Sequence, residues 1–323
     1  MNVSRWLVPA LAGLSLSLGV SAQNYPNRSV KVLVSVPAGG LQDAIARSMA
    51  TRLNEVFGQP VVVENRPGAN TIIAAELAAK SPADGYTLLV ATDSTMSINP
   101  HLYAKLPYDP ERDFAPISQI AQLVEVMFVS AETPASNVRE FVEYAKKQPG
   151  KVNYGSFGLG SNAHLAAMNL QRMTGIEMVH VPYKGGADAI PALQTNQVQL
   201  LVTAIVLGQS SVKAGKAKVL AVSGSRRHPV LPDVPTFAEA GFPAFDSRAW
   251  FGLVTPSGTP SGIVGRLAEE VAKYVKSPAF SEKFASAFAV DAIGSAPAEF
   301  AAFMKADREK YAQIVRAANV RLD

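Results

Sequence analysis

Residues 36–43 read Val-Pro-Ala-Gly-Gly-Leu-Gln-Asp and follow the apolar run Val-Lys-Val-Leu-Val at residues 30–34. This pattern predicts a β-strand that ends at a proline, turns through two glycines and leads into a helix. The first backbone N–H groups of a helix have no partner within the helix and lie at its positive end. The turn is therefore a candidate site for an anion.

The chain continues in the same alternation of strand and helix. Residues 41–57 carry apolar side chains at steps of four, four, four and three, which is the spacing of one helix face. Further helices are expected at residues 71–80, 138–147, 161–173 and 187–194, and strands at residues 30–36, 60–63, 86–92, 151–155, 178–181, 198–203 and 218–223. This alternation predicts an α/β fold with parallel strands and helices on the sheet faces.

The apolar character persists over residues 114–130, which is too long for one ordinary strand. We interpret this segment as one or two strands that cross from a first lobe into a second, and residues 248–254 as a strand that returns. Three helices close the chain near residues 262–275, 279–288 and 298–318. Residues 23–125 with 245–323 are expected to form lobe 1 and residues 126–244 lobe 2. Loops at the carboxyl ends of the strands would line a cleft between them.

The first 22 residues have the pattern of an export signal. Arg5 supplies a positive charge, residues 6–20 are mostly apolar, and Val-Ser-Ala at residues 20–22 suits cleavage after Ala22. The alternative is a membrane anchor, which needs about 20 apolar residues. This stretch is shorter and is interrupted by a proline and two glycines, so we predict an exported, periplasmic protein.

The composition restricts the classes of function. The 323 residues include no cysteine, which excludes disulfides and cysteine metal sites, and the four histidines match no short metal motif, so we expect no metal. The formal net charge of +4 is scattered, and its densest spot, residues 226–228, has no interleaved aromatic residues, so no nucleic-acid partner is expected. The chain has no G-x-S-x-G, H-E-x-x-H or P-loop pattern, and we predict that it is not an enzyme.

In the first lobe, the glycine turn supplies the candidate donors. The N–H groups of Gly39, Gly40, Leu41 and Gln42 could hold a carboxylate, with the Gln42 side chain as a further donor. Asp43 would repel an anion and is expected to complement the helix dipole instead. A plain tight turn is the alternative. Small hydroxyls follow the strand that ends at Thr92, among them that of Ser94.

A second loop of the same kind spans residues 153–164. Its Gly-Leu-Gly-Ser-Asn-Ala at residues 158–163 fits G-x-G-x-x-A, a variant of the dinucleotide fingerprint. The acidic residue expected about twenty positions on would follow the next strand, whereas Glu177 precedes it. We therefore favour an anion site, with Ser156 and Ser161 as hydroxyl donors, over a nucleotide-dependent oxidoreductase. His164 is expected to form hydrogen bonds rather than to act as a base.

A third loop, residues 181–187, reads Val-Pro-Tyr-Lys-Gly-Gly-Ala. Tyr183 could donate to a ligand oxygen and Lys184 could neutralise it. The alternative is a packed tyrosine and a solvated lysine, and for Lys184 this alternative is as good as the functional interpretation.

Six blocks, in this order, resemble the receptors of tripartite tricarboxylate transporters, also called the Bug family of extracytoplasmic solute-binding proteins. The blocks are residues 36–43, Val-Val-Glu-Asn-Arg-Pro-Gly-Ala at 62–69, Asp-Gly-Tyr-Thr-Leu at 84–88, Leu-Pro-Tyr-Asp at 106–109, Val-Pro-Tyr-Lys-Gly at 181–185 and Leu-Pro-Asp-Val-Pro-Thr-Phe-Ala-Glu-Ala-Gly at 231–241. The resemblance covers nearly the whole chain after the export signal.

The resemblance implies a type II periplasmic-binding-protein fold, a flytrap that closes on a small organic acid and delivers it to membrane permease subunits. It implies no cofactor, and we expect a monomer. The site residues that we predict from the loops and the resemblance together are Ala38, Gly39, Gly40, Leu41, Gln42, Asp43, Thr92, Ser94, Ser156, Phe157, Gly158, Gly160, Ser161, His164, Tyr183, Lys184, Gly185, Thr203 and Ala204.

Two departures from the family pattern bear on the ligand. The first turn continues with Leu41 and Gln42, and residues 204–207 read Ala-Ile-Val-Leu where relatives often carry an aromatic-Asp-Asn segment. Together with Phe157 and Leu159 they predict an apolar middle of the cleft. Such a floor suits an aromatic dicarboxylate such as terephthalate better than citrate. A ligand-sensing co-receptor for a signalling system remains an alternative to a transport receptor.

Overall fold

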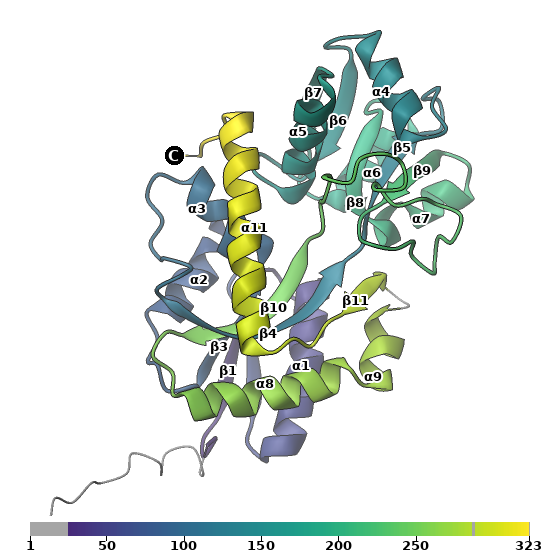
Figure 1. Cartoon of the computed structure of the whole chain (residues 1–323). Helices are drawn as coiled ribbons and strands as arrows, with labels where there is room; N and C mark the ends of the chain where they lie inside the picture. Colours follow the sequence, from purple (N-terminus) through teal and green to yellow (C-terminus); the bar gives the residue numbers. More distant parts are fainter. Residues whose placement is uncertain (1–24, 286–287, 323) are drawn as a thin grey trace, which may run out of the picture.

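The computed structural model describes residues 25–285 and 288–322 and contains two separate β-sheets (Figure 1). The predicted export signal, residues 1–22, lies outside the described residues. Among the described residues no helix is both long and apolar enough to cross a membrane. The two sheets, each with helices, confirm the predicted α/β class with two lobes.

The first sheet has the strand order β11-β4-β10-β3-β1-β2. Strands β1, β2 and β3 are parallel, while β10 is antiparallel to both β3 and β4, and β11 is antiparallel to β4. The bounds are β1 Val30–Val34, β2 Val61–Asn65, β3 Thr87–Thr92, β4 Phe114–Leu123, β10 Trp250–Pro256 and β11 Val290–Ala292.

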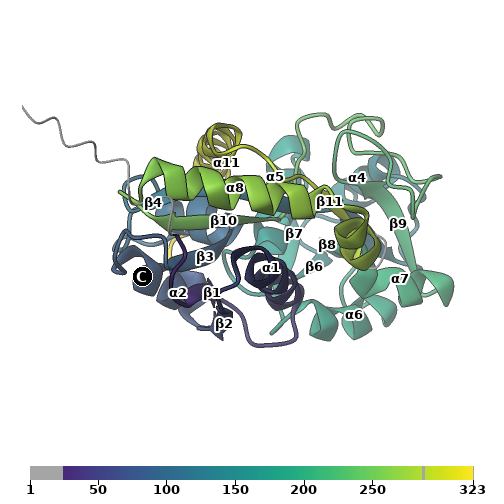
Figure 2. The same ribbon diagram turned by 90° about the horizontal axis from the view of Figure 1, so that it is seen from below.

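Helices cover both faces of this sheet. Figure 2 shows α1 and α8 on the face seen from below, where both contribute to one apolar cluster with the strands. A second cluster on the other face includes α2 and the first half of α11. The bounds are α1 Leu41–Phe57, η1 Ala69–Thr71, α2 Ile72–Ala79, η2 Ser94–Ile98, α3 Asn99–Leu102, α8 Ser261–Val275, α9 Pro278–Phe280, η3 Ser281–Ala285 and α11 Pro297–Ala318.

The second sheet has the order β7-β6-β8-β5-β9. Strand β6 is parallel to β7 and β8, whereas β5 is antiparallel to β8 and β9. Apolar clusters again lie on two faces, one with α4 and α5 and one with α6 and α7. The bounds are β5 Glu125–Ser130, α4 Val138–Lys146, β6 Val152–Ser156, α5 Asn162–Thr174, β7 Met178–Pro182, α6 Gly186–Gln194, β8 Leu200–Ala204, α7 Ile205–Lys213 and β9 Ala217–Val222.

The prediction of parallel strands was wrong for the strands that carry the chain between the sheets. Strand β4 runs in the direction of β3 and leads almost directly into β5, which is antiparallel to its neighbours in the second sheet. The return strand β10 is likewise antiparallel to β3 and β4. The chain leaves the first sheet at the edge where its parallel strands end and enters the second sheet against the direction of β6, β7 and β8. The segment 114–130 is thus two strands, as one of our interpretations had it.

The C-terminal helix α11 connects the two lobes. In Figure 1 it rises from the first sheet towards α3 and α5. Leu102 of α3, Leu165 of α5, and Tyr311 and Ile314 of α11 belong to one buried cluster. Lobe-to-lobe contact is therefore partly apolar.

Close packing of α11 on the first sheet gives a test of the fold. A Cβ on Gly252 of β10 would overlap the ring of Phe300, which is fully buried. We expect Gly252→Ala to lower the free energy of unfolding by about 1–3 kcal/mol, the usual cost of overpacking. Chemical denaturation measures the change.

Gly265→Ala is the matched control, because nothing lies within 4 Å of a Cβ at this exposed position of α8. Alanine favours a helix interior over glycine by about 1 kcal/mol, so this variant is expected to be as stable as the wild type or more so. Equal stability of the two variants would contradict the packing described above.

Candidate ligand-binding site

Strand direction places the predicted loops on facing edges of the two sheets. Strands β1 and β3 run in the same direction as β4, so their carboxyl ends lie at the edge that faces the second sheet. Because β5 runs away from the first sheet and is antiparallel to β8, the ends of β6, β7 and β8 point back. All the predicted loops follow these five strands.

The first-lobe turn offers backbone donors at the start of α1. Gly40 is the N-cap without a side-chain cap, and Gly39 has φ +96°, a conformation that favours glycine. Residues 37–40 are exposed, and among the described residues no hydrogen bond uses the N–H of Gly40, Leu41 or Gln42. The Gly39 N–H donates to Asp43 Oδ2 at 3.0 Å, so it is not the free donor that we expected.

Asp43 holds this turn from inside the lobe. Its carboxylate also accepts from Arg47 Nε at 2.9 Å and from Asn65 Nδ2 at 2.8 Å. These bonds, that from Arg47 above all, lower the pKa of Asp43 to about 2. The charge that we expected to complement the helix dipole is thus also neutralised by a neighbouring cation.

Gln42 is buried and does not supply the side-chain donor that we predicted. Its Nε2 donates to the Val90 carbonyl at 2.7 Å, and its Oε1 accepts from Ser35 Oγ at 3.2 Å. These bonds tie α1 to β3 and to the end of β1. Thr92 is likewise buried and accepts from Thr95 N–H at 3.2 Å, whereas Ser94 is half-buried.

In the second lobe, a histidine that sequence reasoning missed supports the loop. Ser156 is fully buried, and its Oγ lies 2.5 Å from His180 Nε2 on β7 and accepts from the Gly158 N–H at 3.1 Å. The Ser156 hydroxyl is therefore engaged within the lobe. The only signal for His180 was its position on the strand paired with that of Ser156.

The rest of this loop is tied to the start of α5. Ser161 caps the helix, accepting from His164 N–H at 3.3 Å and donating to the Gly158 carbonyl at 2.8 Å. The Gly160 N–H donates to His164 Nδ1 at 3.1 Å. His164 thus forms hydrogen bonds, as predicted, but within the protein.

The two histidines stack with a ring-centroid distance of 4.2 Å. Burial, with His180 as the second cause, lowers the pKa of His164 to about 4, and burial also lowers the pKa of His180. Both rings are consequently neutral at pH 7, and His164 Nδ1 is free to accept.

Of the remaining predicted site residues, some pack on the core of lobe 2, and others are exposed or lie at the start of a helix. Tyr183 is half-buried, packs on the lobe 2 core with Phe157, and donates its N–H to the Ser156 carbonyl at 2.9 Å. Lys184 is exposed and Gly185 is the N-cap of α6. Thr203 is buried at the end of β8, and Ala204 is the N-cap of α7.

Residues 204–207 contribute less to a cleft than we expected. They begin α7, where Ile205 is buried and Val206 and Leu207 pack on the same lobe 2 core. Leu159 in the loop after β6 is a large apolar side chain that is 58% exposed.

The second-lobe loop contacts the first lobe. A Cβ on Gly160 would lie 2.5 Å from Leu102 Cδ1 of α3, so Leu102 covers the glycine that would face a pyrophosphate in a dinucleotide fingerprint. No hydrogen bond among the described residues joins residues 38–43 to residues 156–161, and a site shared by these two segments remains a prediction.

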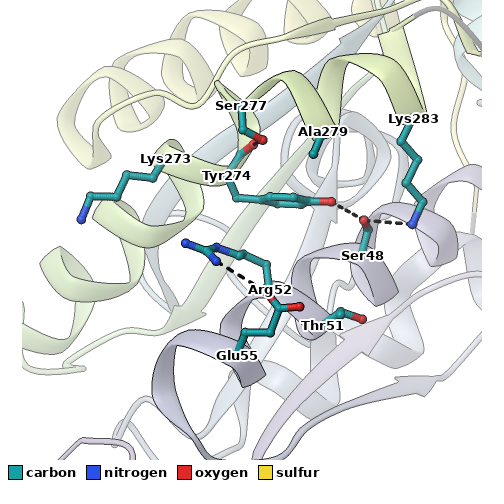
Figure 3. Close-up of a pocket in the computed structure, with 9 residues that line it drawn as sticks. All are labelled: Ser48, Thr51, Arg52, Glu55, Lys273, Tyr274, Ser277, Ala279 and Lys283. Atoms are coloured by element: carbon teal, nitrogen blue, oxygen red, sulfur yellow. Dashed lines mark hydrogen bonds and ion pairs between the residues drawn. The ribbon is translucent and has the colours of Figure 1, made fainter.

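A pocket of about 460 Å³ lies elsewhere, between α1, α8 and η3 (Figure 3). Tyr274 and Lys283 both reach Ser48, the lysine at 3.2 Å. Arg52 pairs with Glu55, and Lys273 pairs with Glu269 and Glu270 outside the pocket. Most of its cationic charge is thus balanced, and its walls come from the second half of α1, not from the glycine turn.

Two sheets joined by two crossings, with loops and helix starts on facing edges, define a two-lobed solute-binding protein. The family model described as tripartite tricarboxylate transporter family receptor, TctC, matches residues 45–320. The chain therefore belongs to the TctC family of receptors.

Two curated relatives match over nearly their whole length. The chain is 33% identical to the UPF0065 protein in the tcbD-tcbE intergenic region of Pseudomonas sp. strain P51, over 97% of this chain and 94% of the relative. It is 32% identical to protein BugT of Bordetella pertussis over the full length of both chains.

Solved structures agree in fold. Rpa4515 of R. palustris with adipate is 33% identical, with TM-score 0.80 and coverage of 92% of this chain and 99% of that one. MatC of Rhodopseudomonas palustris with bound malate is 30% identical, with TM-score 0.76 and coverage of 90% and 100%. Both neighbours hold small dicarboxylates.

The hydrogen bonds of the Asp43 carboxylate with Gly39, Arg47 and Asn65 give a prediction on stability. A carboxyl with a lowered pKa stabilises the fold above its unfolded pKa, near 4, and loses this contribution as the pH falls towards 2. We expect Asp43→Asn to cost about 1–2 kcal/mol at pH 6, a value reduced because Arg47 is half exposed. The cost should shrink at pH 3.

Urea denaturation at pH 6 and pH 3 measures the change in the free energy of unfolding at each pH. Asp233→Asn, an exposed position, is the matched control and should cost nothing measurable at either pH. A cost of Asp43→Asn that is the same at pH 3 and pH 6 would show that its ionised form is not what stabilises the turn.

Proposed function

We propose that this protein is a periplasmic receptor that captures a small organic dicarboxylate and presents it to the membrane subunits of a tripartite tricarboxylate-type transporter. The observation that carries the proposal is the start of α1 behind the exposed turn 37–40, where the N–H groups of Gly40, Leu41 and Gln42 have no protein acceptor among the described residues. Main-chain amides at a helix N-terminus bind carboxylates without an added cation.

Closure explains how binding is reported. A ligand held by both lobes favours the arrangement in which the lobes are close, and a permease can recognise that arrangement. We expect the receptor to be a monomer, which size-exclusion chromatography with light scattering measures.

We further propose that the ligand is an aromatic dicarboxylate such as terephthalate. Leu159 supports it because it is exposed in the loop after β6, and Leu41 because it is only partly buried beside the glycine turn. Adipate and malate, held by the two neighbours, are the aliphatic competitors.

Isothermal titration calorimetry with terephthalate, adipate, malate, citrate and benzoate tests both levels of the proposal. We expect dicarboxylates to bind more tightly than benzoate, and terephthalate at least about tenfold more tightly than citrate, whose hydroxyl and third carboxylate need polar partners. Citrate as the tightest ligand would contradict the aromatic assignment alone. Heat from none of these acids would contradict the receptor function.

The role of the main chain predicts an unusual mutational pattern. Gly39→Val and Gly158→Val place a bulky side chain at φ +96° and +110° in the two loops, so we expect each to weaken binding at least about tenfold. Lys184→Met should weaken binding less, because Lys184 is exposed.

Gly150→Val is the control for backbone strain, since Gly150 has φ +70° and open space around it but lies in the turn before β6. It should lower stability without changing affinity. An equal loss of affinity in the Gly39, Gly158 and Lys184 variants would contradict a site built from main-chain amides.

A further inference from the structure

A cluster of acidic side chains lies where the two lobes meet. Asp93 follows β3, Glu125 opens β5, Asp246 precedes β10, and Asp307 belongs to α11. Asp93, Glu125 and Asp307 are 4–5% exposed. Four carboxyl groups from four segments are thus gathered in a region largely closed to water.

Among the described residues, two cations form ion pairs with these four acids. Lys310 Nζ lies 2.7 Å from Asp307 and 3.8 Å from Asp246, and Arg248 pairs with Asp246 at 2.9 Å. No ion pair among the described residues includes Asp93 or Glu125. The charges of Asp246 and Asp307 are therefore balanced, and those of Asp93 and Glu125 are not.

Hydrogen bonds compensate these two carboxyl groups only in part. Asp93 Oδ1 accepts from Ser94 N–H at 2.8 Å, but Asp93 Oδ2 and Glu125 Oε2 are buried without a partner. The side chains of Ser247 and Asn162 lie close enough to Glu125 to favour its charged form, but burial outweighs them. An unpaired buried carboxylate costs several kcal/mol, whereas a protonated carboxyl is neutral and carries its own donor.

The electrostatics agree with this geometry. Burial, followed by the charge of Asp307, raises the pKa of Asp93 to about 7. Burial, followed by the charge of Asp93, raises the pKa of Glu125 well above its usual range. Both groups therefore hold protons under conditions in which an exposed carboxyl has lost them.

The cluster spans the junction between the lobes. Tyr311 of α11 donates to Asn162 Oδ1 at 2.9 Å, and Asn162 Nδ2 donates to the Ser247 carbonyl at 2.7 Å. Asn162 starts α5 of the second lobe, and Ser247 lies in the returning segment. Movement of one lobe against the other would break these bonds and admit water to Glu125 and Asp93.

We propose that Asp93 and Glu125 are proton-binding sites of the hinge, and that their protons stabilise the arrangement of the lobes described above. The proposal deepens the proposed function and rests on it for the statement that the lobes move. A raised pKa means that the stabilisation is complete below about pH 4 and is lost as the pH rises through about 7.

Other titratable groups in this region do not explain a change near neutral pH. The phenol of Tyr311 has its pKa raised well above 10 by burial, and the pKa values of His164 in α5 and His180 in β7 are lowered by burial. The charged or titratable side chains that face the two carboxyls from the surrounding elements are Asp246, Arg248, Asp307, Lys310 and Tyr311.

The lack of cysteine in the sequence makes a direct distance measurement possible. Asn54→Cys on α1 and Lys147→Cys after α4 place spin labels at exposed positions of the two lobes. Double electron–electron resonance then reports the distance between the lobes in ligand-free protein at pH 5, 6, 7 and 8. We expect the population of a second arrangement to rise more than about tenfold between pH 5 and pH 7, the range over which Asp93 loses its proton.

The variant Asp93→Asn with Glu125→Gln mimics the protonated pair and should keep the pH 5 distance distribution at every pH. Asp233→Asn should behave as the wild type does. A wild-type distribution that is independent of pH, or a pH response that survives in the double variant, would overturn the proposal.

Infrared spectroscopy of the unlabelled wild type gives a second measurement that needs no folded variant. A band of protonated carboxyl groups should be present at pH 6, and its absence would overturn the proposal. Neither experiment contains an organic acid. A failure of ligand binding in calorimetry would therefore contradict the proposed function while leaving the hinge measurement unaffected.

Discussion

The whole arrangement depends on how the chain passes between two sheets. Strand β4 leads almost directly into β5, so the chain enters the second sheet against the direction of its parallel strands, and the return through β10 repeats this reversal in the first sheet. The carboxyl ends of β1, β3, β6, β7 and β8 consequently face one another across the junction. Loops that are far apart in the sequence are brought to one region by backbone direction alone.

Within these loops, most polar side chains that looked available are engaged inside their own lobe. Gln42 bonds to Val90, Asp43 to Arg47, and Ser156 to His180. A loop that must offer main-chain N–H groups to a ligand has to hold its own shape, and side-chain hydrogen bonds from within do this. The proposed site therefore takes its donors from backbone amides, and these side chains position them.

At the junction between the lobes, by contrast, some buried polar side chains are incompletely paired. Apolar contacts of Leu102 and Leu165 with α11 lie close to a cluster that holds more acids than cations. Two balanced carboxylates and two unbalanced carboxyl groups in one dry region are sensitive to any change that admits water. A hinge must be stable in more than one arrangement of the lobes. A junction with buried polar groups favours a single arrangement less strongly than a purely apolar junction does.

Local sequence patterns predicted most of the longer helices and strands and the family, but not α7 or β11. The spacing of Leu41, Ile45 and Met49 predicted α1 with both ends correct, because helix periodicity is a local property. Strand direction, the inward bonds of Gln42 and the support from His180 were decided only by the tertiary structure, because each depends on residues brought together from distant segments. The same holds for Asp93 and Glu125, which are ordinary acids in the sequence and become unpaired only when the lobes bury them together.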